Sequence, residues 1–120
     1  MTNNIYRILL FVYALLILSM SSIPSSNLPK SWLLEWDKVI HFIEYFIFGI
    51  LAMKSMPDIS RKNALIIIPC GILFGFFDEY LQSFISGRFS SQWDVLSDSI
   101  GFSIGVILVW IRADDKLDIY

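Results

Sequence analysis

The sequence predicts an all-α, polytopic membrane protein in which four transmembrane helices form a small bundle. The chain has 120 residues, of which 56% are hydrophobic, whereas soluble domains average about 45–50% apolar residues. The apolar residues gather in four runs, each close to the roughly 17–25 residues that a bilayer-spanning helix needs. Short polar segments join the runs, and the length leaves room for a single membrane domain, residues 1–120.

The first run covers residues 5–23 and contains one charged side chain, Arg7. We expect a membrane helix here, but a second interpretation stays open. Arg7, the apolar residues 8–18 and the small residues that follow also resemble a signal peptide. Apolar residues resume at Met20 and no Ala-x-Ala triplet follows, which favours a retained helix.

The other three runs cover residues 39–56, 64–84 and 95–111. Ser- and Pro-rich residues separate the first two runs, and Pro57 lies between the second and the third, as is typical of loops. Trp93 and Trp110 stand near the two ends of the fourth run, where aromatic side chains anchor a helix at the membrane interface. The lipid bilayer is therefore the predicted environment of the chain.

The distribution of Lys and Arg predicts the orientation, because cytoplasmic loops carry an excess of these residues. Four spans would place both termini and the loop between the second and third runs on one side. That side holds six basic residues and the other side three, so we expect a multi-pass protein of the cell membrane with cytoplasmic termini. The six are Arg7, Lys54, Arg61, Lys62, Arg112 and Lys116, and the three are Lys30, Lys38 and Arg88.

Polar residues of the third run share one helix face. At about 100° per residue, Asp78, Glu79 and Gln82 fall within an arc of about 100°. Gly71 and Gly75 lie in the same arc, and small residues four positions apart let another helix approach closely. This face is predicted to be both polar and closely packed.

Two other runs carry similar polar stripes. The second begins with Asp37, His41 and Glu44 at positions i, i+4 and i+7, and the fourth begins with Asp94 and Asp98. An ionisable group in a membrane helix costs at least about 2.5–3.5 kcal/mol, so it usually faces a protein interior or a watery cavity. We expect the second, third and fourth helices to enclose a polar centre near their outward ends, with the first helix outside it.

This predicted centre contains more acidic than basic residues. Six acids stand against Lys38, Arg88 and His41. Full ionisation would leave an excess of negative charge in a poorly solvated place, so either some carboxyl groups carry protons or a cation occupies the centre. The six acids are Asp37, Glu44, Asp78, Glu79, Asp94 and Asp98.

Two stretches resemble the VanZ-like family of membrane proteins. DKVIHFIEYF, residues 37–46, is similar to the D-K-x-x-H-x-x-x-Y element of that family. Residues 74–105 are similar to its E-x-x-Q, Gly-Arg and D-x-x-x-N-x-x-G-x-x-x-G pattern. The resemblance extends over about residues 37–111 and places these residues at motif positions: Asp37, Lys38, His41, Tyr45, Glu79, Gln82, Arg88, Asp94, Gly101 and Gly105.

The resemblance implies a membrane protein of the cell envelope that lowers susceptibility to glycopeptides such as teicoplanin, the property for which the family is named. Two positions depart from the pattern. Asp98 stands where the family most often has Asn, which adds a charge to the centre, and Ser86 replaces a Pro before the Gly-Arg pair. Asp98 and the motif residues other than the two glycines form the predicted set of binding residues.

Three classes of function fit this set. An enzyme would act on an envelope or lipid-linked molecule, with Glu79, His41 or Glu44 as the acid or base. In that enzyme Lys38 and Arg88 would clamp an anionic group. A binding or transporter-like protein would use the same centre without chemistry, and a structural protein would use it only to fix helix packing. We rank action on an envelope molecule above architecture.

Some residues also have simpler interpretations. Asp37 and Asp94 fit the starts of helices as capping residues. Glu79 is the strongest candidate of the third run because it lies deep, with Gln82 one turn further on. Its neighbour Asp78 is the weaker candidate and stays outside the predicted binding set.

Other classes of function are disfavoured. A net charge of −2 argues against a nucleic-acid partner. A single histidine, His41, cannot form a His-rich zinc site within one chain. A carboxylate-bound Mg²⁺ or Ca²⁺ stays open, but the ligand spacing gives it no support, so no metal site is predicted. The sequence identifies no other cofactor and no oligomeric state, and Cys70 is interpreted as a small packing residue.

Overall fold

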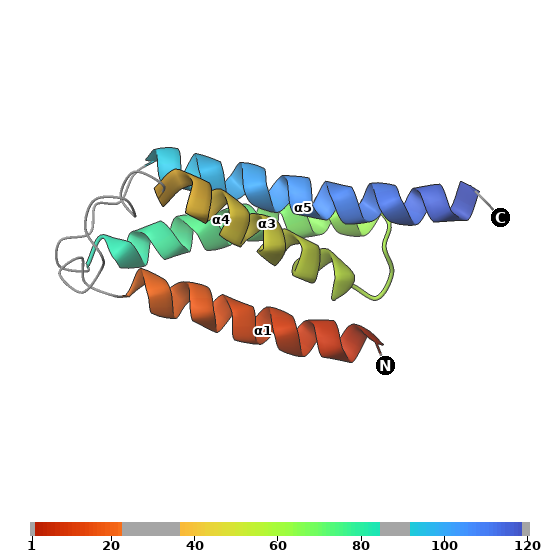
Figure 1. The fold of residues 1–120 in the computed structure, drawn as a ribbon, viewed down its shortest axis with the longest axis horizontal. Coiled ribbons are helices and arrows are strands. Elements are labelled where there is room, and N and C mark those ends of the chain that lie inside the picture. Colours follow the sequence, from red (N-terminus) through yellow and green to blue (C-terminus); the bar gives the residue numbers. More distant parts are fainter. Residues whose placement is uncertain (1, 23–36, 85–91, 119–120) are drawn as a thin grey trace.

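A computed structural model describes residues 2–22, 37–84 and 92–118 of the chain. These residues form four helices and no strand. The helices are α1 (Thr2–Ser21), α3 (Asp37–Lys54), α4 (Arg61–Gln82) and α5 (Gln92–Asp118). They run lengthwise beside one another, with α1 along one side of the group formed by α3, α4 and α5 (Figure 1). The prediction of an all-helical protein is confirmed.

Three of the four helices are long and apolar enough to cross a membrane. The spans are Asn4–Ser21, Arg61–Gln82 and Gln92–Ala113. The helix α3 is not among them, since its 18 residues include Asp37, Lys38, Glu44 and Lys54. The prediction of four transmembrane helices is therefore supported for three, and the charged residues spread along α3 are what separate it from the other helices.

Both termini lie at the same end of the group of helices. Figure 1 shows the start of α1 and the end of α5 at this end, together with the connection between α3 and α4. The starts of α3 and α5 and the end of α4 lie at the opposite end. The predicted polar stripes occupy those three helix ends, so the chain path brings them to one end of the protein.

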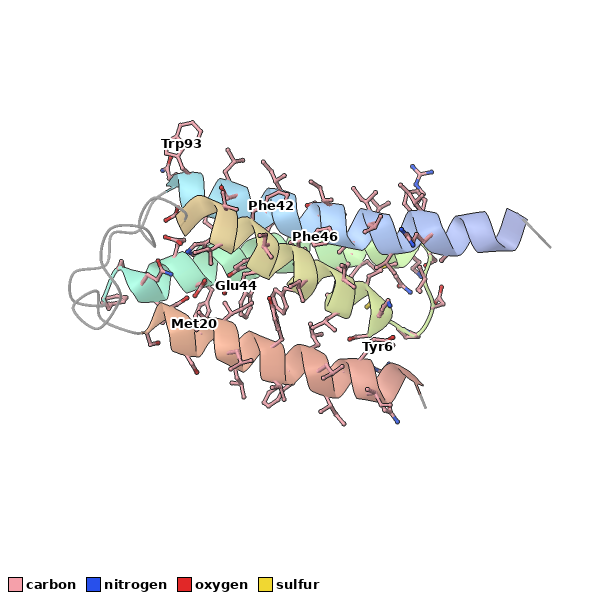
Figure 2. All side chains as sticks on the ribbon, viewed as in Figure 1. Tyr6, Met20, Phe42, Glu44, Phe46 and Trp93 are labelled. Carbon is pink, nitrogen blue, oxygen red and sulfur yellow. The ribbon has the colours of Figure 1, made fainter. Side chains whose placement is uncertain are left out.

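The backbones of α3 and α5 lie in close contact. Gly101 and Gly105 of α5 lie against the carbonyl oxygens of Phe42 and Phe46 of α3, which Figure 2 labels. Gly49 of α3 lies in the same way against the α5 backbone. A Cβ atom at any of these glycines would collide with backbone atoms, so the absence of a side chain sets the separation of the two helices.

An aromatic cluster fills the middle of the bundle. The ring of Phe48 lies 4.9 Å from that of Phe74 and 5.5 Å from that of Phe102. Tyr45 and Tyr13 approach the same ring at 5.8 and 5.9 Å. Such pairs contribute about 0.5–1.5 kcal/mol each beyond their buried area. The cluster joins all four described helices next to the polar residues.

The helix α1 is attached to α3 by polar contacts along its length. The Tyr13 hydroxyl donates to the backbone carbonyl of Glu44 at 2.7 Å. Arg7 Nε donates to the carbonyl of Ser55 at 3.1 Å. Near the same end Lys54 Nζ lies 5.2 Å from the centre of the Tyr6 ring (Figure 2). The helix α1 thus packs on the bundle as an integral part of the fold.

The outer surface of the helices is apolar, whereas part of the interior is polar. Leu73 is 67% exposed and Ile8 64% exposed, as are many other large hydrophobic residues. Trp93 projects away from the bundle at the start of α5 (Figure 2), which suits an interface anchor. This distribution is the reverse of that in a soluble domain and suits helices surrounded by lipid.

The helix α4 starts three residues before the apolar run that predicted it. The Ser60 side chain accepts a hydrogen bond from the Asn63 amide at 3.2 Å and forms the N-cap. Asn63 Nδ2 also donates to the carbonyl of Asp58 at 2.8 Å. Capping chemistry, rather than hydrophobicity, therefore fixes the start of this helix.

Candidate functional site

Seven buried polar side chains gather at the end of the bundle opposite the termini, and we name them the polar centre. Three helices supply them, and α1 supplies none. Among the described residues the centre holds four carboxylates, one imidazole, one phenol and one amide. The members are His41 and Tyr45 of α3, Asp78, Glu79 and Gln82 of α4, and Asp94 and Asp98 of α5.

One hydrogen bond of the centre joins α3 to α5. His41 Nδ1 and Asp98 Oδ1 lie 3.0 Å apart, and both side chains are buried. A carboxylate in this position fixes the orientation of the imidazole ring and favours a proton on Nδ1. The pair lies beside the glycine contact of the two helices, since Phe42 follows His41 and Gly101 is one turn beyond Asp98.

A second hydrogen bond joins α3 to α4. The Tyr45 hydroxyl donates to Asp78 Oδ2 at 3.0 Å, and both residues are 0% exposed. Gly75 of α4 lies next to this bond with room for a small side chain. A Cβ atom at Gly75 would lie 3.5 Å from Asp98 Cβ and 3.9 Å from the Tyr45 ring.

Glu79 completes a compact group with the first pair. One ligand atom each from His41, Glu79 and Asp98 lies within 4.8 Å of the others. These three are buried and come from three different helices. Asp98 Oδ2 is buried and has no hydrogen-bond partner among the residues that the structure describes.

The electrostatic balance of the centre is acidic. Asp78, Glu79, Asp94 and Asp98 are at most 6% exposed. His41 supplies the one ionisable nitrogen among the seven members of the polar centre. Burying several carboxylates together is costly unless hydrogen bonds, protons or cations balance their charge. The arrangement is therefore suited to holding a proton, a metal ion or the cationic part of a ligand.

The predicted site residues divide into three groups. The structure brings together His41, Tyr45, Glu79, Gln82, Asp94 and Asp98 as buried residues of three adjoining helix ends. Glu44 is only half-buried and lies on the side of α3 that faces α1 (Figure 2), where its backbone binds Tyr13. Asp37 and Lys38 belong to the first turn of α3, but their side chains are outside the described set. Arg88 lies outside the described residues.

Asp78 is a member that the predicted binding set omitted. It does not stand at a family motif position, and two adjacent carboxylates on one helix are hard to rank from sequence. The sequence feature that could have indicated its membership is its position on the same helix face as Gly71 and Gly75. Because α4 meets α3 and α5 on that face, Asp78 and Glu79 are both directed inward, toward different partners.

Comparison with known proteins gives the family of the chain. A sequence profile described as VanZ/LLP1 matches residues 2–113, which is most of the chain and includes every member of the polar centre. The chain belongs to the VanZ/LLP1 family. In this VanZ/LLP1 protein the glycines at the motif positions, Gly101 and Gly105, form the contact of α5 with α3. Three apolar helices and family membership together indicate a membrane protein.

The VanZ/LLP1 protein is also similar to an uncharacterized protein of the yeast Schizosaccharomyces pombe. The two are 34% identical over 74 residues, which make up 60% of this chain and 45% of the yeast protein. The chain thus matches less than half the length of that relative. No solved structure shows a significant match to the chain.

Proposed function

We propose that this protein is a multi-pass protein of the cell envelope whose polar centre binds the polar part of a lipid-linked or other envelope molecule. The observation that carries the proposal is the convergence of four buried carboxylates with His41. Such groups are costly inside a membrane bundle and usually mark a ligand, ion or proton path. An outer surface that is apolar along the helices is consistent with this setting.

The proposed topology has four spans with cytoplasmic termini. In this arrangement α3 crosses the membrane with its polar side covered by α4 and α5. Arg7, Lys54, Arg61, Lys62 and Arg112 would then face the cytoplasm, as the excess of positive charge at cytoplasmic ends favours. The polar centre would open toward the outer leaflet, where envelope precursors are exposed.

The centre contains the groups that acid–base chemistry requires. His41 is oriented by Asp98, and Glu79 lies within reach of the same space. If the bound molecule is processed, His41 and Glu79 are the acid–base candidates. Glu44 is the weaker candidate, because it is half-buried on the α1 side of α3.

A role in teicoplanin susceptibility is the finer part of the proposal. The family resemblance supports it. A lipid-linked phosphate fits the polar centre, provided that a cation or the basic residues Lys38 and Arg88 balance the acids. The chemistry of the ligand is then an anionic group on a lipid anchor.

The test compares Glu79→Gln with Asp58→Asn. Both changes remove a carboxylate, but Asp58 is exposed on the connection between α3 and α4, at the end of the bundle opposite the centre (Figure 1). Each chain is expressed in a teicoplanin-sensitive bacterium and extracted in polymer nanodiscs with its bound lipids. We expect the wild type and Asp58→Asn to raise the inhibitory teicoplanin concentration and to retain a lipid by mass spectrometry. Glu79→Gln should fold and lose both properties.

A structural role is the second candidate, and the two hydrogen bonds of the centre favour it. His41–Asp98 ties α3 to α5, and Tyr45–Asp78 ties α3 to α4. In this alternative the buried polar residues fix helix register. Glu79→Gln would then lower the melting temperature as Gly101→Leu does, and no specific lipid would be retained by the wild type.

A further inference from the structure

We infer that His41, Glu79 and Asp98 form a binding site for one divalent transition-metal ion. The inference deepens the proposed function, since it names the cation that would balance the polar centre. It rests on three observations that do not depend on each other: the geometry of the ligand atoms, the state of one Asp98 oxygen and the charge of the surroundings.

The three ligand atoms lie close enough together for one metal ion to bind them after a small movement of Glu79. Nitrogen and oxygen ligands bind Zn²⁺ at about 2.0–2.2 Å, so neighbouring ligand atoms lie about 3.0–3.5 Å apart. His41 Nδ1 and Asp98 Oδ1 are 3.0 Å apart, and a ligand atom of Glu79 lies within 4.8 Å of both residues' ligand atoms. Coordination by one ion would require the Glu79 carboxylate to lie closer to the other two ligand atoms than this limit, which a change of its side-chain torsions could provide.

Asp98 offers a second oxygen that its known partner does not use. Its Oδ1 atom meets His41, whereas Oδ2 is fully buried without a hydrogen-bond partner among the described residues. A buried carboxylate oxygen in this state is costly. The atom faces α4, since it lies 3.9 Å from the position of a Cβ atom on Gly75. A metal ion held by both Asp98 oxygens and by His41 Nδ1 would satisfy it, and binding would release the proton that Nδ1 shares with Oδ1.

The charge of the surroundings favours a cation. Asp78 and Asp94 are also buried carboxylates, so the three ligands are not the full acidic content of the centre. A divalent ion would offset two negative charges and remove much of the electrostatic cost of burying them.

The donor set points to the class of metal. An imidazole nitrogen suits Zn, Fe, Ni and Cu, while Mg²⁺ and Ca²⁺ prefer all-oxygen sites. One nitrogen and two carboxylates suit Zn²⁺ or Mn²⁺. Three protein ligands leave coordination positions open, as in catalytic zinc sites, and an anionic group of the proposed envelope ligand could occupy one of them.

Sequence spacing could not have indicated this site. Each ligand comes from a different helix, and none forms a local pair such as His-x-x-x-His. The ligands meet only because the glycine contact brings α5 close to α3 and because Glu79 faces inward from α4.

The experiment measures metal binding to the full chain in nanodiscs, purified with a tag that contains no histidine. The protein is stripped with a chelator, and Zn²⁺, Mn²⁺ or Mg²⁺ is then titrated as the only added ligand. We expect about one Zn²⁺ or Mn²⁺ per chain, a rise in melting temperature, and binding of Mg²⁺ at least about tenfold weaker. Asp98→Asn and Glu79→Gln should each weaken binding at least about tenfold.

The control variant is Asp58→Asn, which should bind the metal like the wild type. Circular dichroism and gel filtration check that each variant is folded. If the ligand variants unfold, X-ray absorption of the Zn²⁺-loaded wild type decides: one imidazole with oxygen ligands supports the site, and a sphere of oxygen only overturns it.

Three results overturn the inference: a folded wild type without bound metal, equal binding by folded ligand variants, or Mg²⁺ bound as tightly as Zn²⁺. None of these readouts uses an envelope molecule or an antibiotic. Loss of the lipid or teicoplanin phenotype with metal binding intact would count against the proposed function alone. Loss of metal binding with the lipid and teicoplanin phenotypes intact would count against the metal site alone.

Discussion

Gly101 of α5 lies directly against the backbone carbonyl of Phe42 in α3, without room for a side chain between them. Gly75 of α4 also faces the polar centre, but there the nearest atom to an added Cβ, Asp98 Cβ, would be at an ordinary contact distance of 3.5 Å. Gly101 therefore has no space for a side chain, whereas Gly75 has space for a methyl group. Substitution of each by Ala gives a matched pair of variants.

Gly101→Ala should destabilise the protein, whereas Gly75→Ala should not. The first change forces α3 and α5 apart, and overpacking of this kind costs about 1–3 kcal/mol. The second should be neutral or stabilising by up to about 1 kcal/mol, since Ala is the better helix former. Thermal unfolding in nanodiscs measures both. Equal melting temperatures for the two variants would contradict the close contact of α3 and α5.

Tyr45→Phe should destabilise the bundle by about 1–3 kcal/mol, because it removes the hydroxyl that donates to the buried Asp78 carboxylate. The aromatic ring and its contact with Phe48 are kept. The control is Tyr80→Phe, whose ring is 62% exposed on the outer face of α4 and which should change stability by less than about 0.5 kcal/mol. If the Tyr45→Phe and Tyr80→Phe variants had the same free energy of unfolding, this result would contradict a stabilising Tyr45–Asp78 hydrogen bond.

The proposed topology predicts which positions a membrane-impermeant maleimide can reach. Cys70 is the one cysteine of the chain, so Cys70→Ala gives a background free of thiols. In that background Ser26→Cys and Ser90→Cys should be labelled on intact cells, since both would lie outside. Ile59→Cys, between α3 and α4, should be labelled only after permeabilisation. Labelling of all three positions on intact cells would refute four spans with cytoplasmic termini.

The first helix should be retained in the mature protein. Its contacts with α3, Tyr13 to Glu44 and Arg7 to Ser55, make it part of the bundle, and the family match also includes it. Intact-mass measurement of the purified membrane form should therefore include residues 2–21. A mature chain that begins after Ser21 would show that this segment is a cleaved signal peptide instead.

Much of the fold follows from sequence because hydrophobic length is a strong signal for helices in lipid. The four apolar runs and the four described helices overlap closely, and their ends differ by a few residues where capping decides, as at Ser60. The end of α5 differs most, since it continues to Asp118 through polar residues that hydropathy excluded. A helix can keep the same backbone conformation through polar residues that follow its apolar part. A hydropathy pattern marks only the apolar part and therefore misses the extension.

The membership of the polar centre was only partly predictable. Helix periodicity placed His41, Glu79 and Asp98 on inward faces, and the structure has them buried. Periodicity could not separate Asp78 from Glu79 or place Glu44, because a rotation of α3 by a fraction of a turn moves Glu44 toward α1. The pairings themselves depend on how closely the helices approach, which glycine contacts between different helices decide.

The glycine seam between α3 and α5 also limits how anything can enter the protein. With Gly49, Gly101 and Gly105 pressed against the opposite backbone, this side of the bundle is closed to a lipid chain or headgroup moving in from the bilayer. The contact of α4 with the centre is looser at Gly75, where ordinary contact distances leave atoms free to shift. The proposed ligand would then have to approach His41 alongside α4 or from the end of the bundle where α3 and α5 begin.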